Sequence, residues 1–315
     1  MDCRVLLTVD TELTWGHHAR GCSWQENFAR SYEAAGVGVP WQLRTLAEHG
    51  LKACFFVDPM PALVYGIEPI RRMVRPILDA GQEVQLHLHS FWQDLAGGRE
   101  KPRFELTDFD ADGQRDLIRT ARDLLIEAGA PEPIAFRSGS YAADPATLDV
   151  LADLGIAYDS SHNGSHHPWP SALPLDPASI APIAQQGVIE IPVAQMVDKP
   201  GRLRHLQLCA VSFEELRQAL FHAERHAHPL TTLVSHSFEL ASRDGLRPNR
   251  TLCRRFEKLC AFLAAQRQRL PTTHFADIED LVLDAAATPL PAHAPRRARR
   301  MVQQLWSNAV YERAL

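Results

Sequence analysis

Several features that would place the chain in a special class are missing from its 315 residues. No run reaches the roughly 18 consecutive apolar residues of a transmembrane helix. The six cysteines form no CxxC motif and are widely spaced, so neither a zinc ribbon nor a disulfide framework is expected. Lysine and arginine (33) do not outnumber aspartate and glutamate (38), which argues against a nucleic-acid-binding protein. The first residues do not resemble a signal peptide, so we expect a cytoplasmic protein.

The sequence instead alternates short apolar runs with helical patterns. The runs at 4–9, 51–57, 83–89, 134–136, 156–158, 188–192, 230–235 and 270–273 predict strands. Helical periodicity covers 28–49, 67–80, 110–128, 144–154, 212–228 and 249–268. This alternation implies parallel strands joined by right-handed crossovers. We therefore expect an α/β fold, a distorted (β/α) barrel of about seven strands, with a doubly wound open sheet as the competing architecture.

The composition of the chain changes near residue 285. We expect residues 1–284 to form one barrel domain and residues 285–315 to form a Pro/Ala linker followed by a basic amphipathic helix. The sequence RRARR occupies 296–300. The apolar face that follows comprises Val302, Leu305, Trp306, Ala309 and Val310. Such a face can pack on the parent domain, lie on a membrane surface or form a dimer contact, and the pattern alone leaves all three open.

Histidines are numerous, at 15, and two of them end a predicted strand together. His87 and His89 close the run at 83–89, while Asp10 and Glu12 end or follow the run at 4–9. Strand side chains two positions apart point the same way, so each pair can face one cavity. Two imidazoles on one face suit a metal site. The sequence thus predicts titratable groups at the ends of two strands.

Two further strands also end in charged or titratable residues. Arg137 belongs to PIAFRSGSY, where an arginine leaving an apolar strand needs a carboxylate partner. In the same segment Gly139 permits close backbone approach, and Tyr141 can offer a backbone N–H. His236 follows the run at 230–235. The carboxyl ends of barrel strands form active sites, so this convergence predicts an enzyme.

These residues resemble the polysaccharide deacetylases of the NodB-homology type, carbohydrate esterase family 4. The closest likeness is to the branch associated with lipopolysaccharide and O-antigen biosynthesis. The resemblance rests on TVDTE at 8–12, LKACFFV at 51–57, GQEVQLHLHS at 81–90, FRSGSY at 136–141, YDSS at 158–161 and LVSHSFEL at 233–240. It implies a distorted (β/α) barrel and metal-dependent removal of an acetyl group from an N-acetylated sugar.

The resemblance also implies roles for individual residues. Asp10 corresponds to the general base, Arg137 to the arginine that orients it, and His236 to the general acid. Tyr141 lies near the position whose backbone N–H helps to hold the oxyanion.

The metal site departs from the family pattern. Glu12 stands one residue beyond the usual metal-binding aspartate, and His87 matches the first metal histidine. The usual second histidine is replaced by Phe91. We expect His89 to take its place, with Asp94 as a weaker substitute. The metal expected is a divalent ion, most simply Zn²⁺.

Four tryptophans near strand-end loops (Trp15, Trp24, Trp92 and Trp169) could stack on sugar rings, and Trp92 is the one we expect to contact substrate. Three other functions compete with the deacetylase. The two carboxylates of Asp10 and Glu12 could serve a glycoside hydrolase. A related hydrolase of small amides or ureides is the second. The third is a non-catalytic carbohydrate-binding barrel with a degenerate metal site, which Phe91 suggests.

Overall fold

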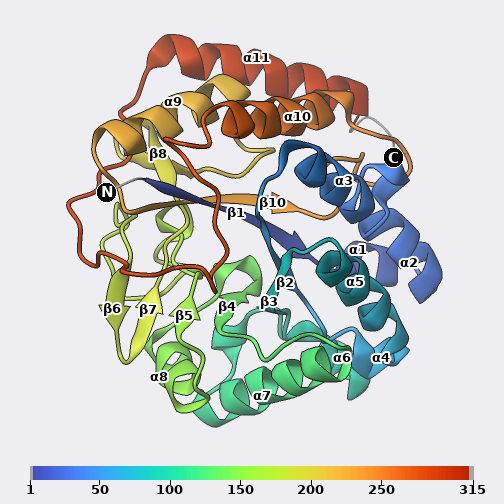
Figure 1. The fold of residues 1–315 in the computed structure, drawn as a ribbon. Coiled ribbons are helices and arrows are strands. Elements are labelled where there is room, and N and C mark those ends of the chain that lie inside the picture. Colours follow the sequence, from blue (N-terminus) through green and yellow to red (C-terminus); the bar gives the residue numbers. More distant parts are fainter. Residues whose placement is uncertain (1–2, 312–315) are drawn as a thin grey trace.

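The structure is a computed structural model that describes residues 3–311, and it is built around one curled, mostly parallel sheet. The sheet order is β10-β1-β2-β3-β4-β5-β7-β6 (Figure 1). Its strands are β1 (Arg4–Thr11), β2 (Cys54–Val57), β3 (Glu83–Leu88), β4 (Ala135–Ser138), β5 (Tyr158–Asp159), β6 (Ile183–Gln185), β7 (Val188–Glu190) and β10 (Leu230–His236). Among the described strands of this sheet, only β6 is antiparallel to its neighbour. The expected α/β barrel with distorted closure is confirmed.

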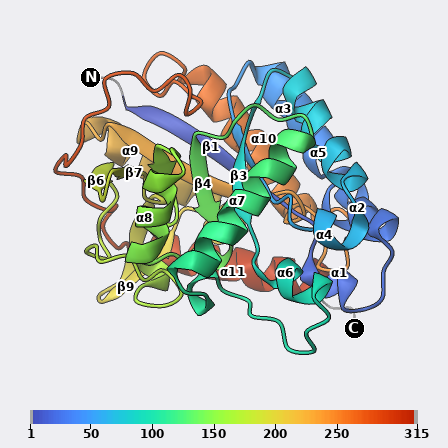
Figure 2. The same cartoon turned by 90° about the horizontal axis from the view of Figure 1, so that it is seen from below.

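Helices cover the outside of this sheet, as the two perpendicular views show (Figures 1 and 2). They are α1 (Trp15–His18), α2 (Trp24–Ser31), α3 (Val39–His49), α4 (Ala62–Tyr65), α5 (Glu68–Asp79), α6 (Phe91–Ala96), α7 (Ala111–Glu127), α8 (Pro145–Asp153), α9 (Phe213–Arg225), α10 (Arg250–Ala265) and α11 (Ala294–Tyr311). Short 3₁₀ turns occupy Ala34–Gly36, Leu106–Asp108, Gly139–Tyr141 and Gly164–His166. The inner core lies between sheet and helices, and β2 is buried along its whole length.

Two predicted elements differ in the structure. The single helix expected over 28–49 is two helices, α2 and α3, separated by a turn at 34–38. Gly36 adopts a φ of +80°, and a Cβ on Gly38 would lie 2.0 Å from the Tyr32 carbonyl oxygen, so the chain turns where only glycine fits. The strand expected at 270–273 makes only an isolated bridge between Thr272 and Val5.

The gap between β7 and β10 is spanned by the segment that follows β7. Ala194 N–H donates to the Thr232 carbonyl at 3.1 Å, and Leu208 N–H donates to the Val234 carbonyl at 2.8 Å. Between these two points the chain forms a separate hairpin of β8 (Gln195–Lys199) and β9 (Arg202–His205). Irregular backbone contacts therefore close the barrel in place of a continuous ladder.

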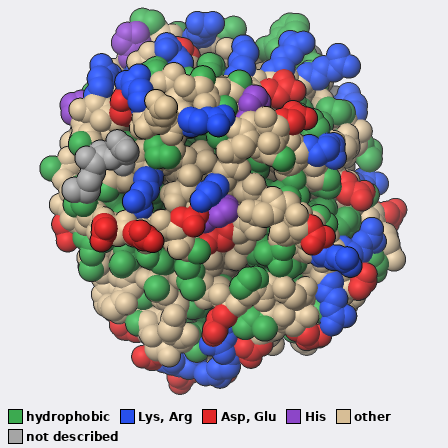
Figure 3. All heavy atoms as spheres, viewed as in Figure 1, with side chains coloured by type: hydrophobic (Ala, Val, Ile, Leu, Met, Phe, Trp, Pro, Cys, Tyr) green, Lys and Arg blue, Asp and Glu red, His purple; other side chains and the backbone are tan. Residues whose placement is uncertain are grey.

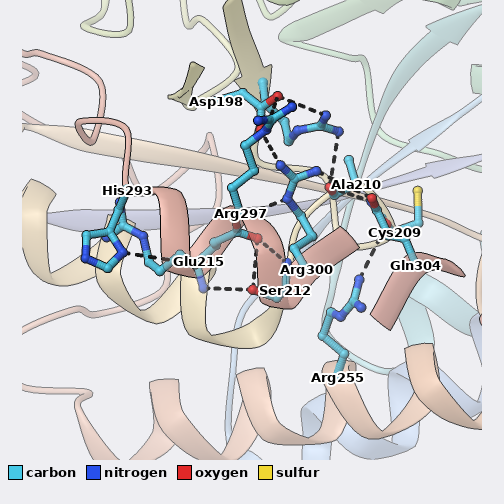
Figure 4. Close-up of polar contacts among 12 residues, drawn as sticks. Asp198, Cys209, Ala210, Ser212, Glu215, Arg255, His293, Arg297, Arg300 and Gln304 are labelled. Carbon is cyan, nitrogen blue, oxygen red and sulfur yellow. Dashed lines mark hydrogen bonds and ion pairs between the residues drawn. The ribbon is translucent and has the colours of Figure 1, made fainter. Parts of the chain in front are cut away.

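The C-terminal helix α11 lies over α9 and α10 (Figure 1) and is held by buried polar contacts (Figure 4). Arg300, only 1% exposed, pairs with Asp198, and its Nε lies 3.1 Å from Glu215 Oε1. Gln304 donates to the Ala210 carbonyl at 3.0 Å, and Asn249 donates to Ser307 Oγ at 3.0 Å. Among the described residues, no helix combines the length and apolar character needed to span a membrane.

Replacing Arg300 with methionine should weaken the attachment of α11, because two buried carboxylates would lose their shared cation. Breaking such a pair from one side typically costs about 3–5 kcal/mol. We expect a lower free energy of unfolding in urea and faster amide exchange across α11. Arg299→Met is the matched control, since Arg299 is exposed. Equal stability of the two variants would contradict this role of Arg300.

Candidate active site at the carboxyl edge of the sheet

The ends of four strands bring together the residues singled out in the sequence. In the sheet register Asp10 of β1 is paired with His236 of β10, and His87 of β3 is paired with Arg137 of β4. Glu12 lies just past the end of β1, and His89 just past the end of β3. Because parallel strands end at the same edge, these six groups form one site in two parts.

The first part is a potential metal centre made of Glu12, His87 and His89. One ligand atom from each residue lies within 4.8 Å of the others. The Nδ1–H of His87 donates to the Arg137 carbonyl at 2.7 Å, which leaves Nε2 free to bind a metal. Nε2 of His87 lies 3.5 Å from Glu12 Oε2, and His89 also pairs with Glu12. Two imidazoles and a carboxylate are the donors that a zinc ion takes, so the residues fit such an ion.

Charge coupling within this centre is strong. Burial disfavours both charged forms, yet the Glu12 carboxylate raises the pKa of His89 to about 9. The two histidines in turn hold the pKa of Glu12 well below its usual value. A metal bound here would therefore displace a proton from His89.

Phe91 and Asp94, at and near the family's second histidine position, take no part in this centre. Phe91 is buried and packs against Trp15, Trp92 and the ring of His89. Asp94 is bound by Arg103, with 2.8 Å between Nη2 and Oδ1. The structure thus favours His89 over Asp94 as the third donor.

The second part of the site is a buried pair of Asp10 and Arg137. Arg137 Nη1 donates to Asp10 Oδ1 at 2.6 Å and to Thr8 Oγ1 at 2.8 Å. Its other nitrogens bind Ser160, and its guanidinium lies 4.3 Å from the centre of the Phe56 ring. Burial opposes ionisation of Asp10, but Arg137 and the nearby histidines outweigh it and lower the pKa of Asp10. Asp10 is therefore a carboxylate at neutral pH.

His236 faces the free oxygen of Asp10, with 3.8 Å between Nε2 and Oδ2. Its Nδ1 lies 3.6 Å from Glu239 Oε2 and 3.1 Å from the amide nitrogen of Gln207. That amide also donates to Glu239 at 2.9 Å. Burial disfavours the imidazolium, yet Glu239 and then Asp10 raise the pKa of His236 to about 9. The ring is therefore protonated at neutral pH.

Sequence reasoning missed three groups at this edge. Glu239 and Gln207 come from loops without periodicity, although Glu239 stands only three residues after His236. Asp58 follows β2 directly, so the strand-end argument used for the other strands would have found it. Its Oδ1 accepts the Met60 N–H at 3.0 Å, whereas Oδ2 has no hydrogen-bond partner. Burial raises the pKa of Asp58 to about 6, against the effect of His89 and His87.

Comparison with known proteins gives a consistent fold. No family model matches the chain. A protein of Mycobacterium smegmatis assigned to the polysaccharide deacetylases aligns over 100% of this chain and 94% of its own, with 18% identity and a TM-score of 0.55. The chain has the polysaccharide deacetylase fold.

Two further proteins are similar to the chain. A family 4 carbohydrate esterase from Streptomyces lividans, solved with acetate, aligns over 84% of this chain and 89% of its own, with 13% identity and a TM-score of 0.40. The peptidoglycan deacetylase-like protein FGM2 of Gibberella zeae is 25% identical over 183 residues, which are 55% of this chain. The match spans about half (48%) of that fungal protein.

Within this deacetylase fold, Tyr141 and Trp92 lie in different surroundings. Ser140 and Tyr141 have φ values of 55° and 62°, so the backbone after β4 turns through the left-handed region. The Tyr141 ring lies 5.7 Å from that of His166, and its buried hydroxyl has no hydrogen-bond partner. Trp92 is fully buried beside Tyr65 and Phe91, so it has no exposed surface to stack on a sugar, and the expected contact is not available. Trp169, at 69% exposed, is the most exposed of the four tryptophans, and Trp15 and Trp24 are half-buried.

Substituting Gly139 with alanine should disturb the potential metal centre directly. An added Cβ would lie 2.4 Å from His89 Nδ1 and 2.8 Å from the Leu88 carbonyl oxygen, so the imidazole must move. Displacing an oriented ligand typically costs 10–100-fold in metal affinity. Zinc titration against a competing chelator measures this loss. Gly97→Ala, whose Cβ would have ordinary contacts at 3.5 Å, should bind zinc like the parent protein. Equal affinity in the Gly139 variant would exclude His89 as a ligand.

Proposed function

We propose that the protein hydrolyses the N-acetyl group of an amino sugar. The observation that carries this proposal is the arrangement of Asp10, paired with Arg137, and a protonated His236 beside the Glu12–His87–His89 centre. Amide hydrolysis needs a base for water, stabilisation of the oxyanion and an acid for the departing amine. Each of these roles has a candidate group at this edge of the sheet.

Asp10 suits the role of base because it is ionised and held in place. Arg137 binds one carboxylate oxygen, and the other faces His236 across 3.8 Å. A water molecule near that second oxygen would lose its proton to Asp10. A divalent ion bound by Glu12, His87 and His89 would lower the pKa of this water and polarise the acetyl carbonyl.

His236 suits the role of acid because Glu239 keeps it protonated. The amine of the sugar leaves poorly as an anion, so it must receive a proton as the C–N bond breaks. Glu239 and Gln207 contact Nδ1, which leaves the Nε2 proton directed toward Asp10 and the reaction centre. The backbone N–H of Tyr141, on the turn after β4, is our candidate donor to the oxyanion.

The TVDTE and HLHS segments resemble those of the deacetylases associated with lipopolysaccharide and O-antigen biosynthesis. This resemblance favours an N-acetylated sugar of such a precursor as the substrate, handled in the cytoplasm. The peptidoglycan deacetylase-like relative supports the wider class of acetylated surface glycans. Acetate release from a panel of N-acetylated sugars, with and without chelator, tests this proposal. Acetate release that survives complete metal removal would overturn the metal-assisted mechanism. Release of reducing sugar without acetate would indicate a glycoside hydrolase.

Asp10→Asn and His236→Ala should each reduce acetate release by about 10²–10⁴-fold, as expected for loss of a general base or acid. Both variants should retain the circular dichroism spectrum and zinc affinity of the parent. His226→Ala is the control, since His226 is exposed at the end of α9 and far from the carboxyl edge. Near-normal turnover by either variant would remove that residue from the mechanism.

The pH dependence should report the protonation of His236. The active form is the imidazolium, so kcat/KM should be maintained below about pH 9 and fall as the pH rises through the pKa of His236. Glu239→Gln removes the carboxylate that stabilises the imidazolium. The alkaline limb should then move down toward the ordinary histidine pKa of 6.5. An unchanged limb in Glu239→Gln would mean that another group controls the profile.

A further inference from the structure

A cavity of about 460 Å³ lies beside the His236 side of the proposed active site. Its walls come from the loops that follow β1 and β10 and from the inner face of α11. They include Thr14 and His17, then Phe238 and Glu239, and finally Ser307. Glu239 joins this cavity to the active site, because its carboxylate also contacts His236.

The cavity wall is strongly basic. It carries four arginines (Arg20, Arg30, Arg243 and Arg255) and one acid, Glu239, which is already paired with His236. Arg255 is 5% exposed and donates to the Leu208 carbonyl at 2.6 Å. Among residues 3–311, no carboxylate lies within ion-pair distance of Arg20, Arg30 or Arg255. Positive charge from Arg20, Arg30 and Arg255 is thus concentrated at this polar cavity, and Asp244 is the carboxylate whose charge acts on the neighbouring His17.

Two local features support a binding site in this cavity. The Nδ1 of His17 is buried in this wall without a hydrogen-bond partner. Burial, followed by the nearby guanidinium groups of Arg30 and Arg20, lowers the pKa of His17, so both arginines act on the same region. Gly245 adopts a φ of +72°, and its Cβ position would lie 2.4 Å from the Arg30 carbonyl oxygen. Glycine thereby lets the loop after β10 pack closely against α2.

We propose that this cavity binds a negatively charged group, a phosphate or a carboxylate. Arginine recognises phosphate and carboxylate through paired N–H donors, and the field of several guanidinium groups adds to each contact.

Calorimetric titration with inorganic pyrophosphate and, separately, with glucuronate tests the cavity without requiring turnover. We expect the parent protein to bind one of the two probes at low salt, and that probe identifies the group as phosphate or carboxylate. The double variant Arg20→Gln/Arg30→Gln should bind it at least about tenfold more weakly. Arg119→Gln, on the exposed surface of α7, is the matched control and should bind like the parent.

Failure of the parent to bind either probe, or equal binding by the double variant, overturns the cavity proposal. A parent protein that binds a probe but releases no acetate from any N-acetylated sugar would instead count against the proposed function. Melting temperatures of all variants, compared with the parent, show whether weaker binding reflects a disturbed fold.

A different observation concerns the outer face of α11. The side chains that this helix buries are polar, Arg300 and Ser307. Its large apolar side chains face solvent instead, with Val302 67%, Leu305 69% and Trp306 65% exposed. Met301 and Val310, at 45% and 40% exposed, extend the same ridge. The apolar face of α11 therefore points to solvent and its polar face packs on the domain, which is the reverse of a helix packed on a hydrophobic core.

The charge of α11 is of one sign. Ala294–Tyr311 contains four arginines and no acidic residue. Arg300 is buried, Arg300 and Arg297 both pair with Asp198, and the charge left for an outside partner is that of Arg296 and Arg299. In Figure 3 the upper edge of the molecule, where α11 lies in Figure 1, shows basic and hydrophobic side chains beside each other. A symmetric contact between two copies of this helix would bring arginines against arginines. An anionic lipid surface complements both the basic charge and the convex apolar ridge.

We infer that α11 rests on an anionic membrane surface, with Val302, Leu305 and Trp306 inserted at the level of the headgroups. Basic amphipathic helices with tryptophan on the apolar face bind such surfaces in this way. This membrane contact does not depend on the chemistry proposed for the active site.

Co-sedimentation with vesicles tests this contact. The parent should bind vesicles of phosphatidylglycerol and phosphatidylcholine, bind pure phosphatidylcholine much more weakly, and lose affinity as salt rises. Leu305→Ser/Trp306→Ser should reduce binding by at least about tenfold. Ile126→Ser is the control, since Ile126 is 41% exposed on α7, on the opposite side of the molecule (Figure 1).

Two results would overturn the membrane contact. One is absence of binding by the parent, or binding that the double variant retains. The other is a parent dimer in analytical ultracentrifugation that becomes monomeric in Leu305→Ser/Trp306→Ser, which would assign the face to a second copy.

Discussion

The guanidinium of Arg137 organises the carboxyl edge of the sheet. It is fully buried, and a buried cation persists only when its donors are satisfied and a counter-charge is close. Its nitrogens reach Thr8 and Asp10 on β1 and Ser160 after β5, and its plane lies over Phe56 of β2. Its own backbone carbonyl accepts the proton of His87 on β3. One residue thus ties five neighbouring strands to a common geometry.

This arrangement gives Asp10 two functions that cannot be separated. The carboxylate neutralises the buried guanidinium, and the guanidinium keeps the carboxylate ionised against the effect of burial. The same backbone that positions Arg137 fixes the tautomer of His87, so the proposed base and the potential metal centre are positioned by one element. Two further buried acids lie near Arg137. Asp159 and Glu190 face each other across β5 and β7, and burial with mutual repulsion raises the pKa of Glu190.

The groups that sequence reasoning placed correctly share a simple cause. Period-two alternation and the common edge of parallel strands suffice to bring Asp10, His87, Arg137 and His236 together. Glu239 and Gln207 obey neither rule, because each reaches His236 from an irregular loop whose path depends on tertiary packing. Trp92 shows the opposite case. Its position after a strand suggested a substrate contact, but the aromatic cluster around α6 buries it completely. Proximity in sequence to a strand end is informative for charged groups, which cannot be buried unpaired, and much less so for aromatic ones.

The same distinction explains the orientation of α11. An amphipathic pattern identifies two faces of a helix but does not say which one packs on the domain, because that depends on what the domain offers. Here the domain offers unsatisfied carboxylate oxygens. Glu215 uses one oxygen to cap the N-terminus of α9, receiving the Ser212 N–H at 2.8 Å, and its other oxygen accepts Arg300. Asp198 on β8 supplies the second acceptor. A cation-lined helix face pairs with the second oxygen of Glu215 and adds to the contact that Arg204 makes with Asp198 at 3.4 Å, whereas an apolar face would leave that Glu215 oxygen buried and unpaired. The attachment of α11 by its polar side, and the exposure of its apolar side, are therefore consequences of the same electrostatic requirement.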